Sequence, residues 1–151
     1  LLGFEECSPV KPESPFRMLS AESIRKMSAS GLVQFGGHTV NHAILSRLAP
    51  AEQEKEITGS LDFLGRLLGH DCRIFAYPNG LSDDYDESAV DCLRGVGVEH
   101  AVTSISGPNP RFASPFDLRR ESIGPADSAA RLGARLEHMI RMDRLRAGAF
   151  P

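Results

Sequence analysis

The chain has 151 residues, of which 41% are hydrophobic and 25% are charged, an ordinary composition for a globular protein. A formal net charge of −3 and an isoelectric point near 6.0 argue against a nucleic-acid-binding protein. No stretch approaches the roughly 18 to 20 apolar residues that span a bilayer, so we expect no membrane span. The 3 cysteines have no CxxC spacing, which supports neither a disulfide framework nor a thiolate zinc site.

Prolines and charges dominate the opening residues, and residues 1–17 are therefore predicted to form an irregular N-terminal arm. The chain begins with Leu1, shows no signal-peptide pattern and reads as the middle of a longer protein, with the N-terminal remainder missing. A regular pattern begins at Ser20, which is expected to cap a helix over 21–30.

The next segments alternate between strand and helix patterns. The apolar run LVQFGG (32–37) predicts a buried strand that ends in two glycines. Pro50 is expected to open a helix over 50–68, because its apolar residues recur at helical spacing. CRIFAYPNG (72–80) predicts a second strand that runs into a tight turn.

The second half of the chain continues this alternation. Asp84 and Glu87 have the spacing of a capping box for a helix that ends near residue 94. Further strands are predicted over 98–105 and 117–124, and a last helix over 127–146. The inner face of that helix is expected to carry Leu132, Leu136, Met139 and Ile140. The alternation predicts an α/β fold with a parallel sheet.

The sequence HTVNH (38–42) is a candidate metal-binding motif. His38 and His42 lie four residues apart, and two imidazoles at this spacing can bind one cation where the backbone turns. The pair follows the predicted strand 32–37, at the end of a strand where α/β folds place active sites. The spacing alone also fits a structural pair, and a hydrolytic metal usually needs a third protein ligand, often a carboxylate.

A second constellation, FAYPNG (75–80), also ends a predicted strand. Pro78-Asn79-Gly80 specifies a tight turn, and such turns can direct backbone N–H groups at a developing oxyanion. A plain strand-terminating turn would have the same sequence.

Together the two motifs resemble the polysaccharide deacetylase family, also called the NodB-homology domain or carbohydrate esterase family 4. FGGHTVNHAILSRL is similar to the family's His-(Ser/Thr)-x-x-His motif, and RIFAYPNG to the branch that carries Tyr-Pro-x-Gly. LSAESIRKM before the histidines and HAVTSISGPN after them resemble the same branch. The similarity extends from about Met18 to Gly124.

The resemblance implies a partial, distorted (β/α) barrel that lacks its N-terminal strands, with residues 18–151 as the C-terminal part of the domain. It also implies a metal-dependent hydrolase that removes N- or O-acetyl groups from an acetylated carbohydrate, with zinc as the usual metal. By this resemblance His38 and His42 are the metal ligands, and Thr39 orients their loop. The remaining roles that it implies are an oxyanion donor, the backbone N–H of Asn79, and a substrate pocket lined by Tyr77 and Pro78.

The chain departs from the family pattern in its carboxylates. The Thr-Phe-Asp-Asp-Gly motif, which supplies the catalytic base and a metal-binding aspartate, does not occur, and Asp83-Asp84 is expected to cap a helix instead. Ala76 stands where the family has arginine, and the family's C-terminal Leu-x-His motif, the source of its general acid, has no clear match. Two alternatives therefore stay open: a truncated, non-catalytic domain that at most binds saccharide or a partner, and an unrelated metallohydrolase. The other histidines are expected to be structural: His70, His100 and His138.

Overall fold

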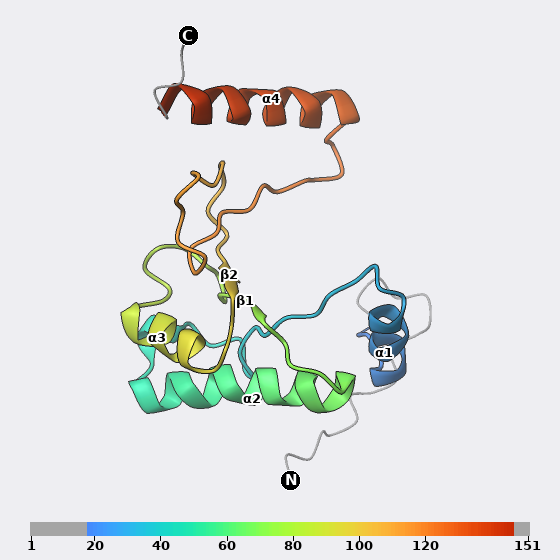
Figure 1. Cartoon of the computed structure of the whole chain (residues 1–151), viewed down its shortest axis with the longest axis vertical. Coiled ribbons are helices and arrows are strands. Elements are labelled where there is room, and N and C mark those ends of the chain that lie inside the picture. Colours follow the sequence, from blue (N-terminus) through green and yellow to red (C-terminus); the bar gives the residue numbers. More distant parts are fainter. Residues whose placement is uncertain (1–17, 147–151) are drawn as a thin grey trace. The chain divides into compact units, whose positions relative to one another are not determined.

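The computed structural model describes residues 18–146, with side chains as far as Arg141, so the predicted arm over 1–17 lies outside the described residues. The chain divides into two compact units, 1–34 and 35–151, which are taken separately. The first unit contributes helix α1, Ala21–Ala29 (Figure 1). The Ser20 hydroxyl accepts a hydrogen bond from the backbone N–H of Ser23, which confirms the predicted N-cap.

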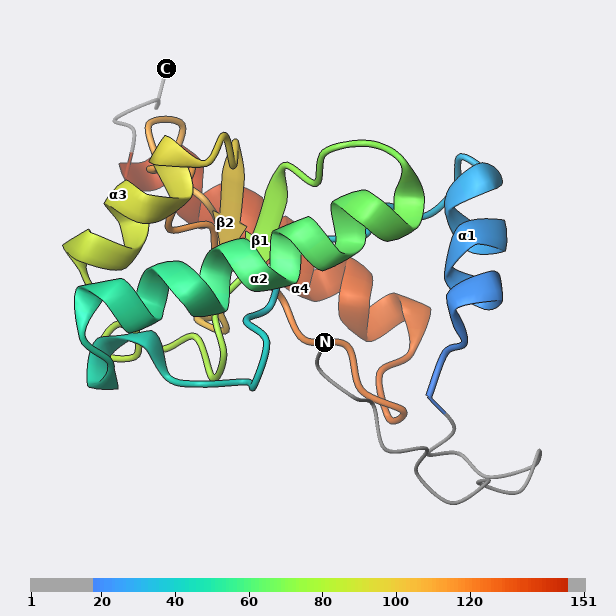
Figure 2. The ribbon, with the colours of Figure 1, turned by 90° about the horizontal axis from the view of Figure 1, so that it is seen from below.

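The second unit alternates helices and short strands. Its two strands pair in parallel, with Ile74 opposite His100 and Ala76 opposite Val102, and they run side by side in Figure 2. A helix connects them, which is the usual way to join parallel strands. The expected α/β architecture is therefore confirmed. The elements in order are the 3-10 helix η1 (Leu45–Arg47), α2 (Pro50–Leu68), β1 (Ile74–Ala76), α3 (Glu87–Gly95), β2 (His100–Val102) and α4 (Ala129–Arg146).

The strand predicted over 32–37 is wrong, since only Gly37 forms a bridge to Phe75. The Gly37 N–H donates to the Ile74 carbonyl at 2.9 Å, and the Gly37 carbonyl accepts from Ala76 N–H at 2.9 Å. The preceding residues have little buried side chain to hold them in a ladder, because Leu32 is 90% exposed and two glycines follow. The strand predicted over 117–124 is likewise reduced to one bridge, between Leu118 and Val102.

The predicted bounds of α2 are confirmed, but the predicted cap of α3 is wrong. The carboxylate of Asp86 accepts from the Ala89 N–H and is the N-cap. Asp84 accepts from the Leu81 N–H at 2.8 Å and so closes the preceding turn instead. The local pattern could not separate two aspartates that lie two residues apart, because either can cap a helix.

The inner face predicted for α4 is correct only in part. Leu132 and Met139 are half-buried, whereas Leu136 is 44% and Ile140 54% exposed. None of the helices within residues 18–146 has the length and apolar character needed to cross a bilayer.

The core lies between α2, α3 and the two strands, and α2 and α3 pack against each other. Ile57 of α2, Leu93 of α3 and Ala101 of β2 are completely buried. Full burial of a Leu or Ile side chain stabilises a fold by about 1.5 to 3 kcal/mol. The core therefore fixes α2 against β1, and the predicted site loops emerge beside these two elements.

Candidate active site

His38 and His42 lie in the loop that follows the bridge between Gly37 and β1. Their ring centres are 4.8 Å apart, with the planes inclined at 76°. His38 Nδ1 lies 2.7 Å from the Ala76 carbonyl oxygen. Because a carbonyl only accepts, Nδ1–H donates, which leaves Nε2 as the ring nitrogen that can bind a metal ion. The two histidines that the sequence suggested are thus brought together, and one of them is held in a ligand-competent tautomer.

The backbone of this loop is strained. Among residues 18–146, the non-glycine residues with positive φ are Thr39 at 60°, His42 at 55° and Asn79 at 56°. Each such conformation costs on the order of 1 to 3 kcal/mol and persists where the surrounding structure enforces it. All three belong to the two loops that the sequence singled out. Thr39, a β-branched residue in this conformation, is also buried, and its hydroxyl has no partner within the described part of the chain.

The carboxylate of Glu56, on α2, accepts hydrogen bonds from the loop 38–42, here called the histidine loop. Its Oε2 accepts from the backbone N–H groups of Val40 and Asn41, both at 2.8 Å, and its Oε1 accepts from Asn41 Nδ2 at 2.6 Å. Burial by itself would raise the pKa of Glu56, but the hydrogen bonds from Asn41 and Val40 outweigh it, so the pKa lies below the ordinary value. Glu56 is therefore anionic near neutral pH.

The second loop, 77–80, is anchored in the core by its first residue, Tyr77. This side chain is 1% exposed, and its hydroxyl donates to the Phe116 carbonyl at 2.9 Å. Its ring stacks on Tyr85 with centroids 3.8 Å apart. Burial raises the pKa of Tyr77, and the neighbouring Tyr85 and Asp117 raise it further, so the phenol is neutral. Gly80, with φ 75°, accepts a hydrogen bond at its carbonyl from Ser104 N–H at 2.8 Å.

These loops border one open cavity of about 440 Å³. Most of the predicted site residues line it, whereas Pro78 is fully buried and Thr39 lies beneath the loop surface. Ser104 and Arg120, which no sequence motif indicates, also line it. Arg120 Nε donates to the Thr103 carbonyl at 2.5 Å, and its Nη2 donates to Ser104 Oγ at 3.2 Å. The lining residues are His38, His42, Ala76, Tyr77, Asn79, Ser104 and Arg120.

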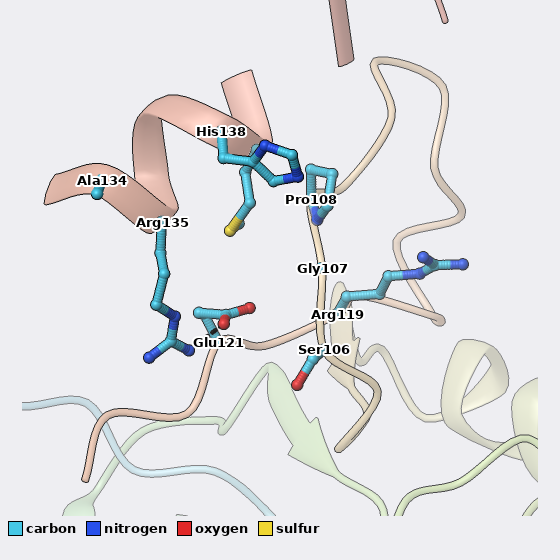
Figure 3. A pocket seen from close by; sticks show the side chains of 9 residues that line it. Ser106, Gly107, Pro108, Arg119, Glu121, Ala134, Arg135 and His138 are labelled. Atoms are coloured by element: carbon cyan, nitrogen blue, oxygen red, sulfur yellow. Dashed lines mark hydrogen bonds and ion pairs between the residues drawn. The ribbon is translucent and has the colours of Figure 1, made fainter. Parts of the chain in front are cut away.

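A larger cavity, of about 580 Å³, lies elsewhere, between α4 and the segments that follow β2 (Figure 3). His138 lines it, but none of the predicted site residues does. Two of its lining charges are already paired with each other, because Arg135 forms an ion pair with Glu121, and Arg135 also pairs with Asp127. The cavity beside the histidine pair is therefore the better candidate site.

Comparison with known proteins decides the family. Residues 12–112, two thirds of the chain, match the polysaccharide deacetylase family. The chain belongs to the polysaccharide deacetylase family. The matched range includes the histidine loop and the 77–80 turn, and both therefore lie within the deacetylase homology.

Named relatives agree with this assignment. YxkH of Bacillus subtilis, which bears the name of a polysaccharide deacetylase, is 26% identical over 121 residues, or 80% of this chain and 42% of that protein. The structure of the Streptococcus pyogenes deacetylase PplD in complex with acetate superimposes with a TM-score of 0.71 at 26% identity, covering 78% of this chain and 50% of that one. IcaB from Ammonifex degensii gives a TM-score of 0.62 at 28% identity, covering 78% and 52%.

The expected fold class, an α/β part of the deacetylase barrel, is confirmed by these superpositions. The chain spans about half the length of the deacetylases that it matches.

The residues present fit part of the metal site that the deacetylase resemblance implies. Two imidazoles bound to one tetrahedral zinc at about 2.0 to 2.1 Å have ring centres about 5 Å apart, close to the 4.8 Å seen here. The hydrogen bond from His38 to a backbone carbonyl is the usual second partner of a metal-binding histidine. Among the residues that the structure describes, no third His, Cys, Asp or Glu joins the pair. The fit is therefore that of a two-ligand half-site.

Proposed function

We propose that this chain supplies the metal-binding and oxyanion-binding side of a deacetylase site, which removes N- or O-acetyl groups from a carbohydrate. The observation that supports this proposal best is the meeting of His38, His42 and Asn79 around one cavity. These residues come from two loops that lie far apart in the sequence, and both loops carry the backbone strain typical of functional sites.

In this proposal each residue has a definite role. His38 and His42 hold a divalent ion, zinc by family resemblance, through their free ring nitrogens, and Thr39 shapes the loop between them. When bound, the ion supplies Lewis-acid polarisation of the acetyl carbonyl and a more acidic water. Asn79 N–H has no acceptor within the described residues and is the candidate donor to the tetrahedral oxyanion. Tyr77 forms the apolar wall of the pocket.

The described residues place no carboxylate in this cavity to accept the proton of the attacking water. The proposed reaction therefore needs a segment that carries the family's Asp-Asp motif, and positioned proton transfer typically contributes about 10² to 10⁴-fold to the rate. We expect the chain alone to release no measurable acetate. The alternative, a domain that binds saccharide without hydrolysis, is favoured by the same lack of a carboxylate.

The test measures acetate released from an acetylated chito-oligosaccharide in the presence of zinc or cobalt. The chain alone is compared with the chain preceded by a segment that carries the Asp-Asp motif. The proposal predicts turnover only for the extended chain, and loss of that turnover in its His38→Ala variant. Saccharide binding without turnover by the extended chain would favour the non-catalytic alternative, and turnover that survives His38→Ala would refute the site.

A further inference from the structure

The histidine loop does not hold its own shape. Thr39 and His42 both have positive φ, which an unsupported chain of non-glycine residues rarely adopts. The loop follows a single bridge at Gly37 rather than a strand, so little backbone pairing orders it. Some other part of the protein must therefore keep the two imidazoles 4.8 Å apart.

Glu56 of α2 provides the required contacts. Its carboxylate oxygens accept hydrogen bonds from the backbone N–H groups of Val40 and Asn41 and from the side-chain amide of Asn41, with N···O distances of 2.6 to 2.8 Å. The two residues that it holds lie between the histidines. Hydrogen bonds to an ionised acceptor are stronger and shorter than those between neutral groups. A rigid helix thus fixes the middle of the loop through one carboxylate.

The neighbouring surface of α2 is shaped for the same loop. Gly59 lies one helical turn after Glu56, and a Cβ there would come within 2.8 Å of Val40 Cγ2. A Cβ on Gly37, just before the loop, would come within 3.0 Å of Ser60 Oγ. The close packing and the three hydrogen bonds therefore act on the same few loop residues.

We propose that Glu56 is the positioning residue of the deacetylase half-site. Glu56 holds the 38–42 loop so that both imidazoles face one divalent ion. Glu56 is not itself a metal ligand in this proposal, because its two oxygens are occupied by loop N–H donors. The metal-binding part of the inference rests on the proposed function. The part that concerns the loop geometry stands on the contacts alone.

The first experiment needs no metal. In the full chain, NMR measures amide hydrogen exchange at Val40 and Asn41, and NOEs between the His38 and His42 rings. Glu56→Ala is expected to remove the exchange protection and the NOEs. Glu54→Ala is the matched control, because Glu54 is an exposed carboxylate on the same helix and its charge acts on Cys92 of α3. Protection and NOEs in Glu56→Ala equal to those of the control would overturn the proposal.

A conservative variant separates hydrogen bonding from charge. In Glu56→Gln one oxygen remains to accept both backbone N–H groups, and the Asn41 amide can turn over to accept from the new NH₂ group. We expect this variant to keep most of the loop geometry that Glu56→Ala loses. A Glu56→Gln variant as perturbed as Glu56→Ala would refute positioning by hydrogen bonds.

The second experiment titrates each variant with Co²⁺ and follows visible absorption. Loss of a group that orients metal ligands typically weakens affinity about 10 to 100-fold, and we expect this weakening in Glu56→Ala but not in Glu54→Ala. If the unmodified chain takes up no Co²⁺, the proposed metal function fails, while the NMR result still decides the role of Glu56. Equal Co²⁺ affinity in all variants, with binding intact, would overturn the role of Glu56 at the metal site.

Discussion

Gly80 and Gly97 have similar left-handed backbones but different surroundings. The φ of Gly80 is 75° and that of Gly97 is 84°. A Cβ on Gly80 would lie 2.9 Å from Ser104 N and 3.1 Å from the Tyr77 carbonyl oxygen, whereas a Cβ on Gly97 would meet nothing within 4 Å. Gly80 is therefore needed both for its φ and for the close approach of the 77–80 turn to Ser104.

This difference predicts unequal costs for the same substitution. Gly97→Ala is expected to lower the free energy of unfolding by about 1 to 2 kcal/mol, the cost of a left-handed L-residue. Gly80→Ala is expected to cost that amount plus about 1 to 3 kcal/mol for the forced shift of its neighbours. Urea denaturation of both variants measures the difference. Equal destabilisation would show that the turn and Ser104 do not pack as the structure has them.

Some residues that line the candidate site can be identified from the sequence and others cannot. The meeting of His38, His42 and Asn79 around one cavity could be predicted, because their motifs are local and each follows an apolar segment. Arg120 and Ser104 could not, since no short motif marks them. They reach the cavity only because the segments 103–105 and 118–120 run alongside each other after the bridge between Val102 and Leu118. Such non-local pairing is not visible in one sequence.

At the scale of elements, α2 packs one face against the core and another against the histidine loop, and its glycines Gly59 and Gly65 lie in different surroundings. A Cβ on Gly59 would meet Val40 Cγ2 at 2.8 Å, whereas one on Gly65 would be in ordinary contact, 3.7 Å from the His70 carbonyl oxygen. Replacing an unconstrained helix glycine by alanine stabilises a helix by about 1 kcal/mol.

Gly65→Ala is therefore expected to raise the free energy of unfolding by about 1 kcal/mol. Gly59→Ala is expected to show no such gain, because the new methyl group displaces Val40 and with it the histidine loop. Thermal denaturation compares the stabilities, and NMR shifts of the loop amides report its displacement. A Gly59→Ala variant as stable as Gly65→Ala, with unchanged loop amides, would contradict the packing of the loop on α2.

The stack of Tyr77 on Tyr85 joins β1 to the segment before α3, and it makes a prediction about alkaline pH. Burial raises the pKa of both phenols, and for Tyr85 the hydrogen bond to Asp117 raises it further. Stability is then unaffected below the ordinary tyrosine pKa of about 10. Above it the free energy of unfolding falls as the pH rises, because the unfolded chain releases these protons first.

The chain contains 2 tyrosines, and both are in this stack, so absorbance at 295 nm reports on them alone. We expect tyrosinate absorbance to rise above pH 10 only together with loss of far-UV circular dichroism. Ordinary titration near pH 10 in a chain that keeps its circular dichroism would show that the stack is open to water.

The elements themselves could be predicted with uneven success. The helix Pro50–Leu68 was predicted to the residue, because proline, apolar periodicity and a terminal glycine all agree there. The strand predicted over 32–37 failed, since a short apolar run does not reveal whether a partner strand lies beside it. The exposure of Leu136 and Ile140 was missed for a similar reason, because periodicity shows that a helix has an apolar face but not what covers it.

At the scale of the whole molecule, the chain matches about half the length of its deacetylase relatives, and the metal site that we propose has two of its ligands in this chain. The rings of His38 and His42 lie 4.8 Å apart, but the described residues add no carboxylate to them. Two neutral imidazoles do not offset the charge of a divalent ion, so binding by this chain is expected to be weak but specific.

Metal titration of single histidine variants measures whether His38 and His42 bind one ion together. Calorimetry with Zn²⁺ would compare the unmodified chain with His38→Ala, His42→Ala and, as a control from the other cavity, His138→Ala. We predict one bound ion per chain, lost to the same degree in His38→Ala and His42→Ala and unchanged in His138→Ala. Unaltered Zn²⁺ binding in His38→Ala and His42→Ala, or a loss confined to His138→Ala, would contradict the account.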